Sequence, residues 1–388
     1  MTNEEFITKH QDADVQALAL TTIPVGIDLQ YCLRQIVGLQ TVKKKIPSLA
    51  DRQGIVFPPR ISLEQCSSEQ TALYKQQVVE RLLPMKRAKM ADLTGGFGID
   101  FSFLAKLFGE AHYVERDEKL CEIARHNFPL LDLPQARIHC AASEDFLDEM
   151  GDFDILYLDP SRRDADGRKV VALNNCSPDI EALQGKLLSH ARVVIAKLSP
   201  ILDIKDAVRR LPDVHEVHVV SVDGECKEVL LVLSKEAKGM TYHCVNLAAQ
   251  THIFSTEEQD AEPVIAAHLE PYLYEPNASI LKAGVQNALC KNYNIQKLHP
   301  FSHLFISAHF IENFPGRTFT IEDTYSFSKS DIKRLQSDIS KCNLTVRNFP
   351  ATVAELRKRL KLREGGDDYL FATTLADGSH VLLRCRQI

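Results

Sequence analysis

The sequence predicts an α/β fold for the middle of the chain, with a largely parallel sheet covered by helices on both faces. Seven candidate strands alternate with helical segments over residues 86–236, which is the pattern of a covered parallel sheet. A glycine-rich turn between the first strand and its helix, at residues 92–98, predicts a nucleotide-binding corner. The strands are expected at residues 88–93, 112–115, 137–140, 154–158, 192–197, 216–222 and 228–234.

The last two strands depart from strict alternation. Only residues 223–227 separate them, and Asp223-Gly224 within that stretch is a strong hairpin signal. A hairpin makes the final strand antiparallel to its neighbour. All-parallel dehydrogenase sheets do not end in this way, so the hairpin is evidence independent of the glycine turn.

The flanking regions have different patterns. Residues 1–85 are predicted to be mostly helical, and Ser67-x-x-Gln70 has the spacing of a capping box that opens a helix running to residue 83. Residues 237–316 mix strand-like and helix-like pieces, with one helix expected at 277–291. Residues 317–388 predict a β-α-β-α-β-β unit. We therefore expect four regions: 1–85, 86–236, 237–316 and 317–388.

Composition excludes several classes of protein. Of 388 residues, 45% are hydrophobic and 25% charged, and the net charge of -6 does not indicate a nucleic-acid binder over the whole chain. From Arg317 onward, however, 13 Lys and Arg stand against 9 Asp and Glu, which favours a polyanion contact there; a solvated helix face is the alternative. Ten cysteines without a C-x-x-C pair suit a reducing cytosol and give no metal site. No signal peptide or membrane span is expected, which predicts a cytoplasmic protein.

The glycine turn, Asp92-Leu-Thr-Gly-Gly-Phe-Gly98, excludes two common nucleotide motifs. A dinucleotide G-x-G-x-x-G needs glycine where Phe101 stands, and a P-loop needs a Gly-Lys-Ser/Thr ending. The order D-x-x-x-G-x-G resembles the first motif of Rossmann-like methyltransferases that use S-adenosyl-L-methionine. This resemblance implies that Asp92, Thr94, Gly95, Gly96 and Gly98 hold that cofactor, with the glycines admitting close approach of the backbone.

Two further acids follow strands. Glu115 ends the second strand, 17 residues after Gly98, where a carboxylate can accept hydrogen bonds from both ribose hydroxyls. Asp117 is predicted to be the N-cap of the next helix. Asp145, after the third strand, is expected to contact adenine, although an ordinary helix cap remains an alternative.

Asp159-Pro-Ser-Arg-Arg163 follows the fourth strand and is expected in the same crevice, because ligands bind beyond the carboxyl ends of such strands. It is similar to the D/N-P-P-Y/F motif of enzymes that methylate base amines, with Arg162 in place of the aromatic residue. We expect Asp159 and Arg162 to be catalytic, Arg162 as a plane that stacks on a base. Uridine-C5 chemistry is excluded because Ser199 stands where a cysteine nucleophile is needed.

Basic residues suggest where a nucleic acid binds. Arg162, Arg163, Arg168 and Lys169 crowd the mouth of the expected crevice and could hold phosphates, but the interleaved Asp164 and Asp166 also permit a salt-bridged loop. In the C-terminal unit, Arg347 and Arg357 are further candidates for RNA contacts, with a solvated helix as the alternative.

The whole chain resembles a bacterial family of class I methyltransferases with a THUMP-like C-terminal domain. The resemblance rests on residues 63–68, 92–98, 159–163 and 274–278, with Arg347 and Gly365-Gly366. It implies a Rossmann-like seven-stranded methyltransferase sheet with an antiparallel last strand, an N-terminal helical region, and a C-terminal α+β part that is ferredoxin-like and then THUMP-like. It also implies methylation of a structured RNA, tRNA or rRNA. A protein or small-molecule methyltransferase and a non-catalytic RNA-binding protein are the alternatives.

Overall fold

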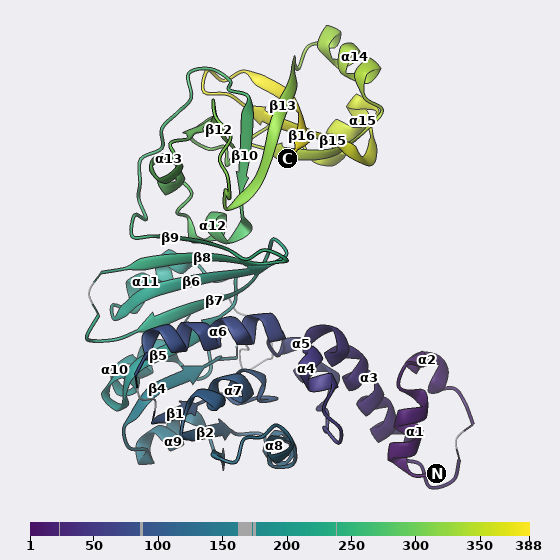
Figure 1. Ribbon diagram of the computed structural model, residues 1–388, viewed down its shortest axis with the longest axis vertical. Coiled ribbons are helices and arrows are strands. Elements are labelled where there is room, and N and C mark those ends of the chain that lie inside the picture. The colour runs from purple at the N-terminus through teal and green to yellow at the C-terminus, as the bar shows by residue number, and fades with distance from the viewer. Residues whose placement is uncertain (23, 86–87, 162–172, 174–175, 238) are drawn as a thin grey trace. The chain divides into compact units, whose positions relative to one another are not determined.

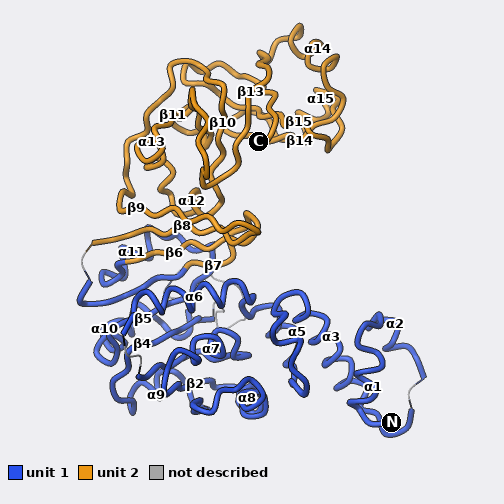
Figure 2. The backbone as a smooth tube through the Cα atoms, in the orientation of Figure 1, with its two compact units in different colours: residues 1–215, 230–238 blue, residues 216–229, 239–388 orange. Residues whose placement is uncertain are grey.

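The protein forms two compact units (Figures 1 and 2). The structure, a computed structural model, describes residues 1–22, 24–85, 88–161, 173, 176–237 and 239–388. The first unit comprises residues 1–215 and 230–238, and the second comprises residues 216–229 and 239–388. No helix within these described ranges combines the length and the apolar character that crossing a bilayer requires.

The N-terminal region is helical, as predicted. Its helices are α1 (Asn3–His10), α2 (Val15–Leu18), α3 (Leu29–Lys45), α4 (Pro47–Ala50), α5 (Arg60–Gln65) and α6 (Glu69–Leu82). The cap of α6 differs from the expected one: Ser68, not Ser67, accepts a hydrogen bond from the Thr71 N–H at 3.3 Å. The side chain of Ser67 does not cap α6 and instead contacts Asp100 in the site described below.

The first sheet has the strand order β3-β2-β1-β4-β5-β7-β6-β8-β9. Its first five strands are β1 (Lys89–Asp92), β2 (Glu110–Glu115), β3 (Ala136–Cys140), β4 (Phe153–Leu158) and β5 (Ala191–Leu198), and all their mutual pairings are parallel. The intervening helices are α7 (Ile99–Leu104), η1 (Ala105–Leu107), α8 (Glu118–Leu130), α9 (Ser143–Glu149) and α10 (Ile180–His190), with α11 (Ile204–Arg210) after β5. The alternation predicted for this region is confirmed, and α6 packs beside α7 (Figure 1).

The predicted hairpin is also present. Strand β6 (Val214–Val222) and β7 (Glu225–Leu233) are joined by two residues, Asp223 with φ 49° and Gly224 with φ 79°. Positive φ at both positions is the signature of a type I′ turn, which matches the twist of the antiparallel strands it connects. The sheet continues beyond the seven predicted strands: β8 (Thr241–Leu247) pairs parallel with β6, and β9 (His252–Thr256) pairs antiparallel with β8.

The second sheet, order β11-β12-β10-β13-β16-β15-β14, belongs to the C-terminal part. Its first strands are β10 (Tyr272–Pro276), β11 (Gln296–Lys297) and β12 (Phe305–Ser307). The single helix expected at 277–291 is instead two, α12 (Ala278–Ala283) and α13 (Ala288–Tyr293). Gly284, with φ 75°, ends α12 in the left-handed conformation that commonly terminates a helix.

The remaining elements confirm the predicted β-α-β-α-β-β order. They are β13 (Gly316–Ser326), α14 (Lys329–Asp338), β14 (Lys341–Arg347), α15 (Val353–Leu360), β15 (Arg363–Thr374) and β16 (His380–Gln387). Leu335 from α14 and Leu356 and Leu360 from α15 are buried in one core with Leu370 and Leu382 from the sheet. Spacings of three and four residues place such side chains on one helix face, so the helices cover the sheet with their apolar side.

Candidate active site

The candidate site lies at the carboxyl ends of neighbouring parallel strands. Asp92 on β1 is the direct neighbour of Tyr157 on β4, so Asp159, two residues further, follows at the same edge. This is the edge where open α/β sheets bind ligands. The sheet therefore brings the glycine turn and the Asp-Pro segment together, as the sequence predicts.

Two of the three glycines are required by the protein's own packing. A Cβ atom on Gly95 would stand 2.1 Å from the ring of Tyr113, and one on Gly98 would stand 2.9 Å from the ring of Phe128. Gly98, the N-cap of α7, also has φ 82°. Close packing of side chains against the turn, in addition to any ligand, thus accounts for glycine at both positions.

Gly96 is different. A Cβ atom there would meet only the Thr94 carbonyl oxygen, at 3.7 Å, although φ is 55°. Its N–H donates to Glu115 Oε2 at 2.9 Å, and the Tyr113 hydroxyl donates to its carbonyl oxygen at 2.5 Å. The backbone of Gly96 is therefore held in place from one side while the space beside its Cα stays open.

Asp92 is a buried carboxylate, 2% exposed. Its Oδ1 accepts hydrogen bonds from the Thr94 N–H at 2.9 Å and the Thr94 hydroxyl at 3.3 Å. Burial raises the pKa of Asp92 to about 8; the nearby carboxylates of Asp100 and Asp159 add to this effect, and the Thr94 N–H and Lys197 oppose it. At neutral pH the side chain favours its neutral form until a cation approaches it.

Thr94 joins the turn to the Asp-Pro segment. The Asp159 N–H donates to Thr94 Oγ1 at 2.6 Å, and the same hydroxyl donates to Asp92. One hydroxyl thus uses both its acceptor and its donor capacity to fix two loops. The predicted cofactor residue Thr94 has at least this structural role.

A chain of alternating charges runs inward from Asp159. Lys197 Nζ, on β5, lies 2.5 Å from Asp159 Oδ2 and 3.5 Å from Asp100 Oδ2, and Lys75 Nζ, on α6, lies 3.2 Å from Asp100 Oδ1. The Asp159 side chain is 39% exposed, whereas that of Lys197 is 10% exposed and that of Lys75 is 1% exposed. We call Lys75, Asp100, Lys197 and Asp159 the charge chain; its two cations and two carboxylates balance.

Hydroxyl groups complete the environment of Asp100. Ser67 Oγ donates to Asp100 Oδ2 at 2.8 Å, and the Tyr157 hydroxyl donates to it at 2.7 Å. Burial alone would raise the pKa of Asp100, but Lys75 and Lys197, together with these two hydrogen bonds, bring it well below its usual range. Asp100 is therefore an ionised carboxylate in the protein interior, which needs this full set of partners.

Sequence reasoning missed the interior part of the charge chain. A signal exists, because Lys197 ends the apolar run of β5, and Asp100 stands among apolar residues of α7 that are all buried. A charged residue inside a buried apolar run is unusual unless it is paired. Nothing in the spacing, however, identifies the partners, since Lys75 comes from a helix before the first strand.

Glu115, the last residue of β2, contacts the glycine turn directly. Glu115 Oε1 accepts from the Asp117 N–H at 2.9 Å while Oε2 accepts from Gly96, so two backbone groups orient this half-buried carboxylate. Asp117 accepts hydrogen bonds from the N–H groups of Lys119 and Leu120. The prediction that Asp117 caps α8 is confirmed.

Asp145 is exposed in the first turn of α9. The N-cap of that helix is Ala142, which makes no side-chain cap, so the alternative role of Asp145 as a cap does not hold. Its predicted contact with adenine stays a prediction. Ser143 ties this loop to the site, because its hydroxyl donates to the Leu93 carbonyl at 2.6 Å.

Four predicted basic residues, Arg162, Arg163, Arg168 and Lys169, lie outside the described residues. Before them, Ser161 exchanges two backbone hydrogen bonds of 2.9 Å with Ser177. The roles proposed for Arg162 in catalysis and for the other three in phosphate binding stay predictions.

In the C-terminal part, Arg347 and Arg357 have partners within the protein. Arg347 pairs with Glu275 Oε1 at 2.7 Å, and Arg317 binds the other oxygen of this carboxylate, whose side chain is only 5% exposed. Arg357 lies 3.6 Å from Glu364. Glu275 on β10 thus binds Arg317 of β13 and Arg347 of β14, and RNA contacts by Arg347 and Arg357 stay predictions.

The order β3-β2-β1-β4-β5-β7-β6 with its closing hairpin, a glycine turn after β1 and acids after β2 and β4, defines a Rossmann-like methyltransferase fold. The crystal structure of a putative methyltransferase from Porphyromonas gingivalis W83 is 32% identical, with a TM-score of 0.88, over 99% of this chain and 97% of that chain. This chain belongs to the same family. Residues 316–387 match the family model of a THUMP domain-like region, and residues 272–315 that of a ferredoxin-like domain.

Other solved structures are more distant. A putative RNA methyltransferase from Pyrococcus horikoshii matches with 16% identity and a TM-score of 0.36, over 50% of this chain and 98% of that one. An rRNA methylase from Streptococcus thermophilus matches with 14% identity and a TM-score of 0.32, over 42% of this chain and 94% of that one. At these values neither match bears on the substrate of this chain. No curated protein matches the sequence.

Proposed function

We propose that this protein is an S-adenosylmethionine-dependent methyltransferase that acts on a structured RNA. The observation that carries the proposal is the Thr94 hydroxyl, which joins the Asp92 turn to the Asp159 backbone. One binding corner and one partly exposed carboxylate are thereby fixed at the same edge of a methyltransferase sheet. Membership in the family of the Porphyromonas protein supports the reaction type.

The residues at this edge fit the cofactor. The open space beside Gly96 admits a ligand against the backbone. A cationic amino group close to the buried Asp92 would lower the pKa of its carboxyl group and favour the ionised form. Glu115 offers an oriented carboxylate for ribose hydroxyls. The bound cofactor supplies an activated methyl group on a sulfonium centre. Gly96, Asp92 and Glu115 would hold it, and Gly95 and Gly98 would shape the turn.

Asp159 is the group suited to meet the acceptor. Lys197 binds one of its carboxylate oxygens, and the Thr94 hydroxyl fixes its backbone, so the side chain is pre-oriented while remaining partly exposed. The second oxygen would accept a hydrogen bond from the acceptor N–H or O–H and orient its lone pair. Positioning and electrostatics of this kind supply most of the rate in transfer reactions between held reactants.

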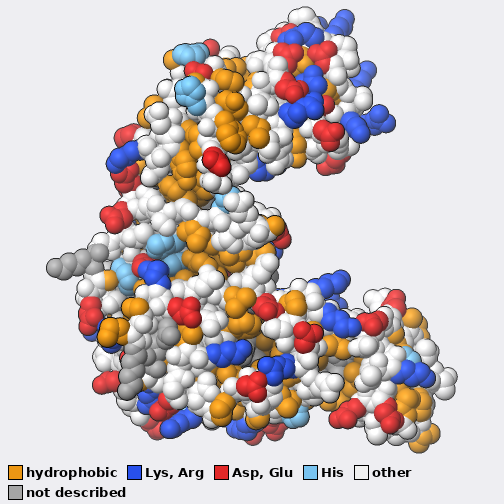
Figure 3. All heavy atoms as spheres, in the orientation of Figure 1, with side chains coloured by type: hydrophobic (Ala, Val, Ile, Leu, Met, Phe, Trp, Pro, Cys, Tyr) orange, Lys and Arg blue, Asp and Glu red, His pale blue; other side chains and the backbone are white. Residues whose placement is uncertain are grey.

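The C-terminal domain supports RNA as the substrate class. THUMP-like domains are associated with structured RNA, and this one carries a group of exposed cations. The α15 basic group, as we call it, comprises Lys341, Lys358, Arg359, Lys361 and Arg363. Arg359 lies over the ring of Phe327 at 4.1 Å. Figure 3 shows Lys and Arg side chains around α14 and α15, interspersed with Asp and Glu.

Transfer of a labelled methyl group tests the proposal. The purified chain, incubated with labelled cofactor and total RNA from cells that lack the protein, should label RNA. Asp159→Asn should lose transfer by at least about a hundredfold while cofactor affinity stays within a few-fold. Asp148→Asn, which changes an exposed carboxylate on α9 paired with Lys186, is the control and should leave transfer unchanged. Labelling of protein instead of RNA would favour the alternative substrate class.

A further inference from the structure

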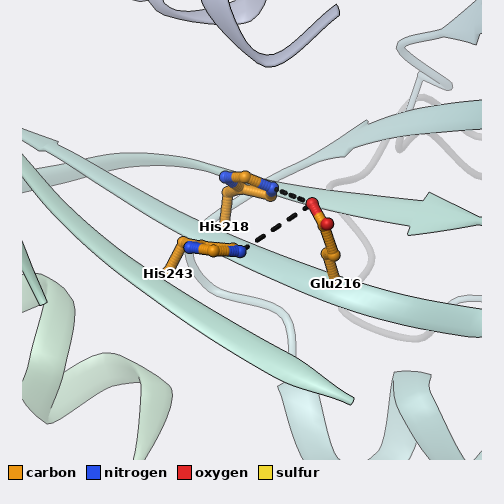
Figure 4. A group of neighbouring side chains, drawn as sticks. All are labelled: Glu216, His218 and His243. Carbon is orange, nitrogen blue, oxygen red and sulfur yellow. Dashed lines mark hydrogen bonds and ion pairs between the residues drawn. The ribbon is translucent and has the colours of Figure 1, made fainter. Parts of the chain in front are cut away.

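Two histidines and a glutamate converge on one face of the first sheet, within the second unit (Figure 4). Glu216 and His218 lie two residues apart on β6, so their side chains share a face, and His243 on β8 is the direct parallel neighbour of His218. Glu216 Oε2 lies 2.9 Å from His218 Nε2 and 3.8 Å from His243 Nε2. The two imidazole rings stack 4.5 Å apart, and one carboxylate oxygen thus faces both Nε2 atoms.

A second observation concerns the far side of His243. Its Nδ1 lies 2.8 Å from Ser255 Oγ, on the neighbouring strand β9. When Nδ1 carries the proton and donates a hydrogen bond to Ser255 Oγ, Nε2 keeps its lone pair, and this lone pair is directed toward Glu216. Histidines that bind metals are held in this way by an outer partner, which selects the tautomer and orients the ring.

We propose that Glu216, His218 and His243 bind a divalent transition metal ion, with zinc as the preferred ion. Two imidazoles and one carboxylate are a ligand set that zinc uses. Zinc bonds of about 2.1 Å in a tetrahedron separate ligand atoms by about 3.4 Å. The two separations between the carboxylate oxygen and the imidazole nitrogens, 2.9 and 3.8 Å, lie on either side of this value, and all three ligand atoms lie within 4.8 Å of one another.

A similar set of residues in the first unit, Glu110, His112 and His139, does not converge on one point and serves as a comparison. On β2, Glu110 and His112 are also two residues apart, and the ring of His139 on β3 stacks on His112 at 5.0 Å. There, His139 Nε2 points at His112 Nδ1, 3.0 Å away, so the ligand atoms form a line and do not converge.

The proposed ion would join β6 to β8. Strand β6 is the last strand of the methyltransferase-type order, and β8 is the first strand beyond it. Within the described part of the chain, these three residues are the one group of His, Cys, Asp and Glu side chains that converges on a metal position. Three protein ligands leave a coordination position for water or another donor, and burial of His218 limits exchange of the ion.

Direct metal analysis of the full-length protein tests this inference. Protein purified without chelators is expected to contain about one equivalent of zinc by mass spectrometry of the metal. After removal of metal by dialysis against a chelator, zinc should rebind at one site in a competition titration. Cobalt should bind the same site and give the absorption of a four-coordinate ion. Glu216→Gln and His243→Gln should each weaken zinc binding at least about a hundredfold.

Two further variants sharpen the result. Ser255→Ala should weaken binding about tenfold, because it removes only the outer partner of His243. His139→Gln, in the linear histidine pair, should bind zinc like the unaltered protein. Wild-type protein that neither contains zinc nor rebinds it at micromolar concentration would overturn the inference, whatever the variants do. Equal loss in His139→Gln and His243→Gln, with both variants folded by circular dichroism, would also overturn it.

Discussion

Gly95 and Gly96 are adjacent glycines whose substitution should have different consequences. A methyl group on Gly95 would collide with the Tyr113 ring, which is packed beneath the turn, whereas one on Gly96 would enter the open space proposed for the ligand. Glycine at position 95 is therefore needed for packing in the folded protein, and glycine at position 96 is needed to leave space for the ligand. The sequence pattern alone, which simply favours glycine at both positions, cannot separate these two reasons.

Alanine at each position tests this distinction. Gly95→Ala should lower the free energy of unfolding by about 3 kcal/mol, because the buried ring cannot move aside without overpacking the core. Gly96→Ala should lower it by only about 1 kcal/mol, the cost of a left-handed residue, but should weaken cofactor binding at least about tenfold. Chemical denaturation and calorimetric titration measure the two effects. Equal affinity in Gly96→Ala and the unaltered protein would contradict the proposed position of the ligand.

The pKa of Asp92 makes the stability of the protein depend on pH. Its pKa is about 8 in the folded protein and near 3.9 in an unfolded chain, so the folded state holds a proton that the unfolded state has lost at neutral pH. The contribution of Asp92 to stability is thus present below about pH 4 and declines as pH rises to 8.

The variant Asp92→Asn lacks this titration. Without cofactor, its stability relative to the unaltered protein should increase by about 3 kcal/mol between pH 5 and pH 7.5, close to the full linkage slope for one proton. Urea denaturation of both proteins across this range measures the difference. Parallel pH profiles for the two proteins would show that Asp92 is ionised in the folded state.

At the scale of secondary structure, the charge chain links α6, α7, β4 and β5. Lys75 and Asp100 come from helices that pack together, and Lys197 and Asp159 come from neighbouring strand ends. The strands themselves follow from the sequence, because alternation and burial give all seven positions. The charge chain cannot be predicted in this way, because its four residues are far apart in sequence and meet only when α6 packs against the sheet.

Because the charges of the charge chain balance, substitutions of its residues should have non-additive effects on the free energy of unfolding. In Asp100→Asn, the two buried lysines of the charge chain share one carboxylate. In Lys75→Met, Asp100 loses one of its two cationic partners. Each single variant should lower the free energy of unfolding by about 3–5 kcal/mol. The double variant keeps the balanced Lys197–Asp159 pair and should cost less than the sum by about 2 kcal/mol. A double-mutant cycle by urea denaturation measures this coupling. Additive costs would mean that Lys75 and Asp100 do not act as a pair.

For the whole molecule, the sequence predicts the class of each part better than its contacts with substrate. The glycine turn, the closing hairpin and the C-terminal β-α-β-α-β-β order are local patterns, and all three are present. Arg347 illustrates the limit: a basic residue in a basic domain suggests RNA, yet its guanidinium is bound by Glu275, which lies on another strand. Lys358, Arg359, Lys361 and Arg363, by contrast, are exposed at the surface, where phosphates can reach them.

Salt dependence tests the RNA surface. Replacing Lys358, Arg359, Lys361 and Arg363 together by Gln should weaken RNA binding and reduce the slope of log affinity against log salt by roughly 3, since each lost phosphate contact removes most of one counterion. The control replaces Lys329 and Lys333, exposed cations on α14, and should change the slope by less than about 1. Equal slopes for both variants and the unaltered protein would place RNA contacts elsewhere.

We propose that this chain methylates RNA through the site around Asp159. Mass spectrometry of the nucleosides of total RNA, from cells with and without the protein, tests it most directly. We expect one methylated nucleoside to disappear when the protein is absent, to return with the unaltered chain, and to stay absent with Asp159→Asn. An unchanged set of methylated nucleosides, together with no methyl uptake by RNA from the purified protein, would contradict the claim.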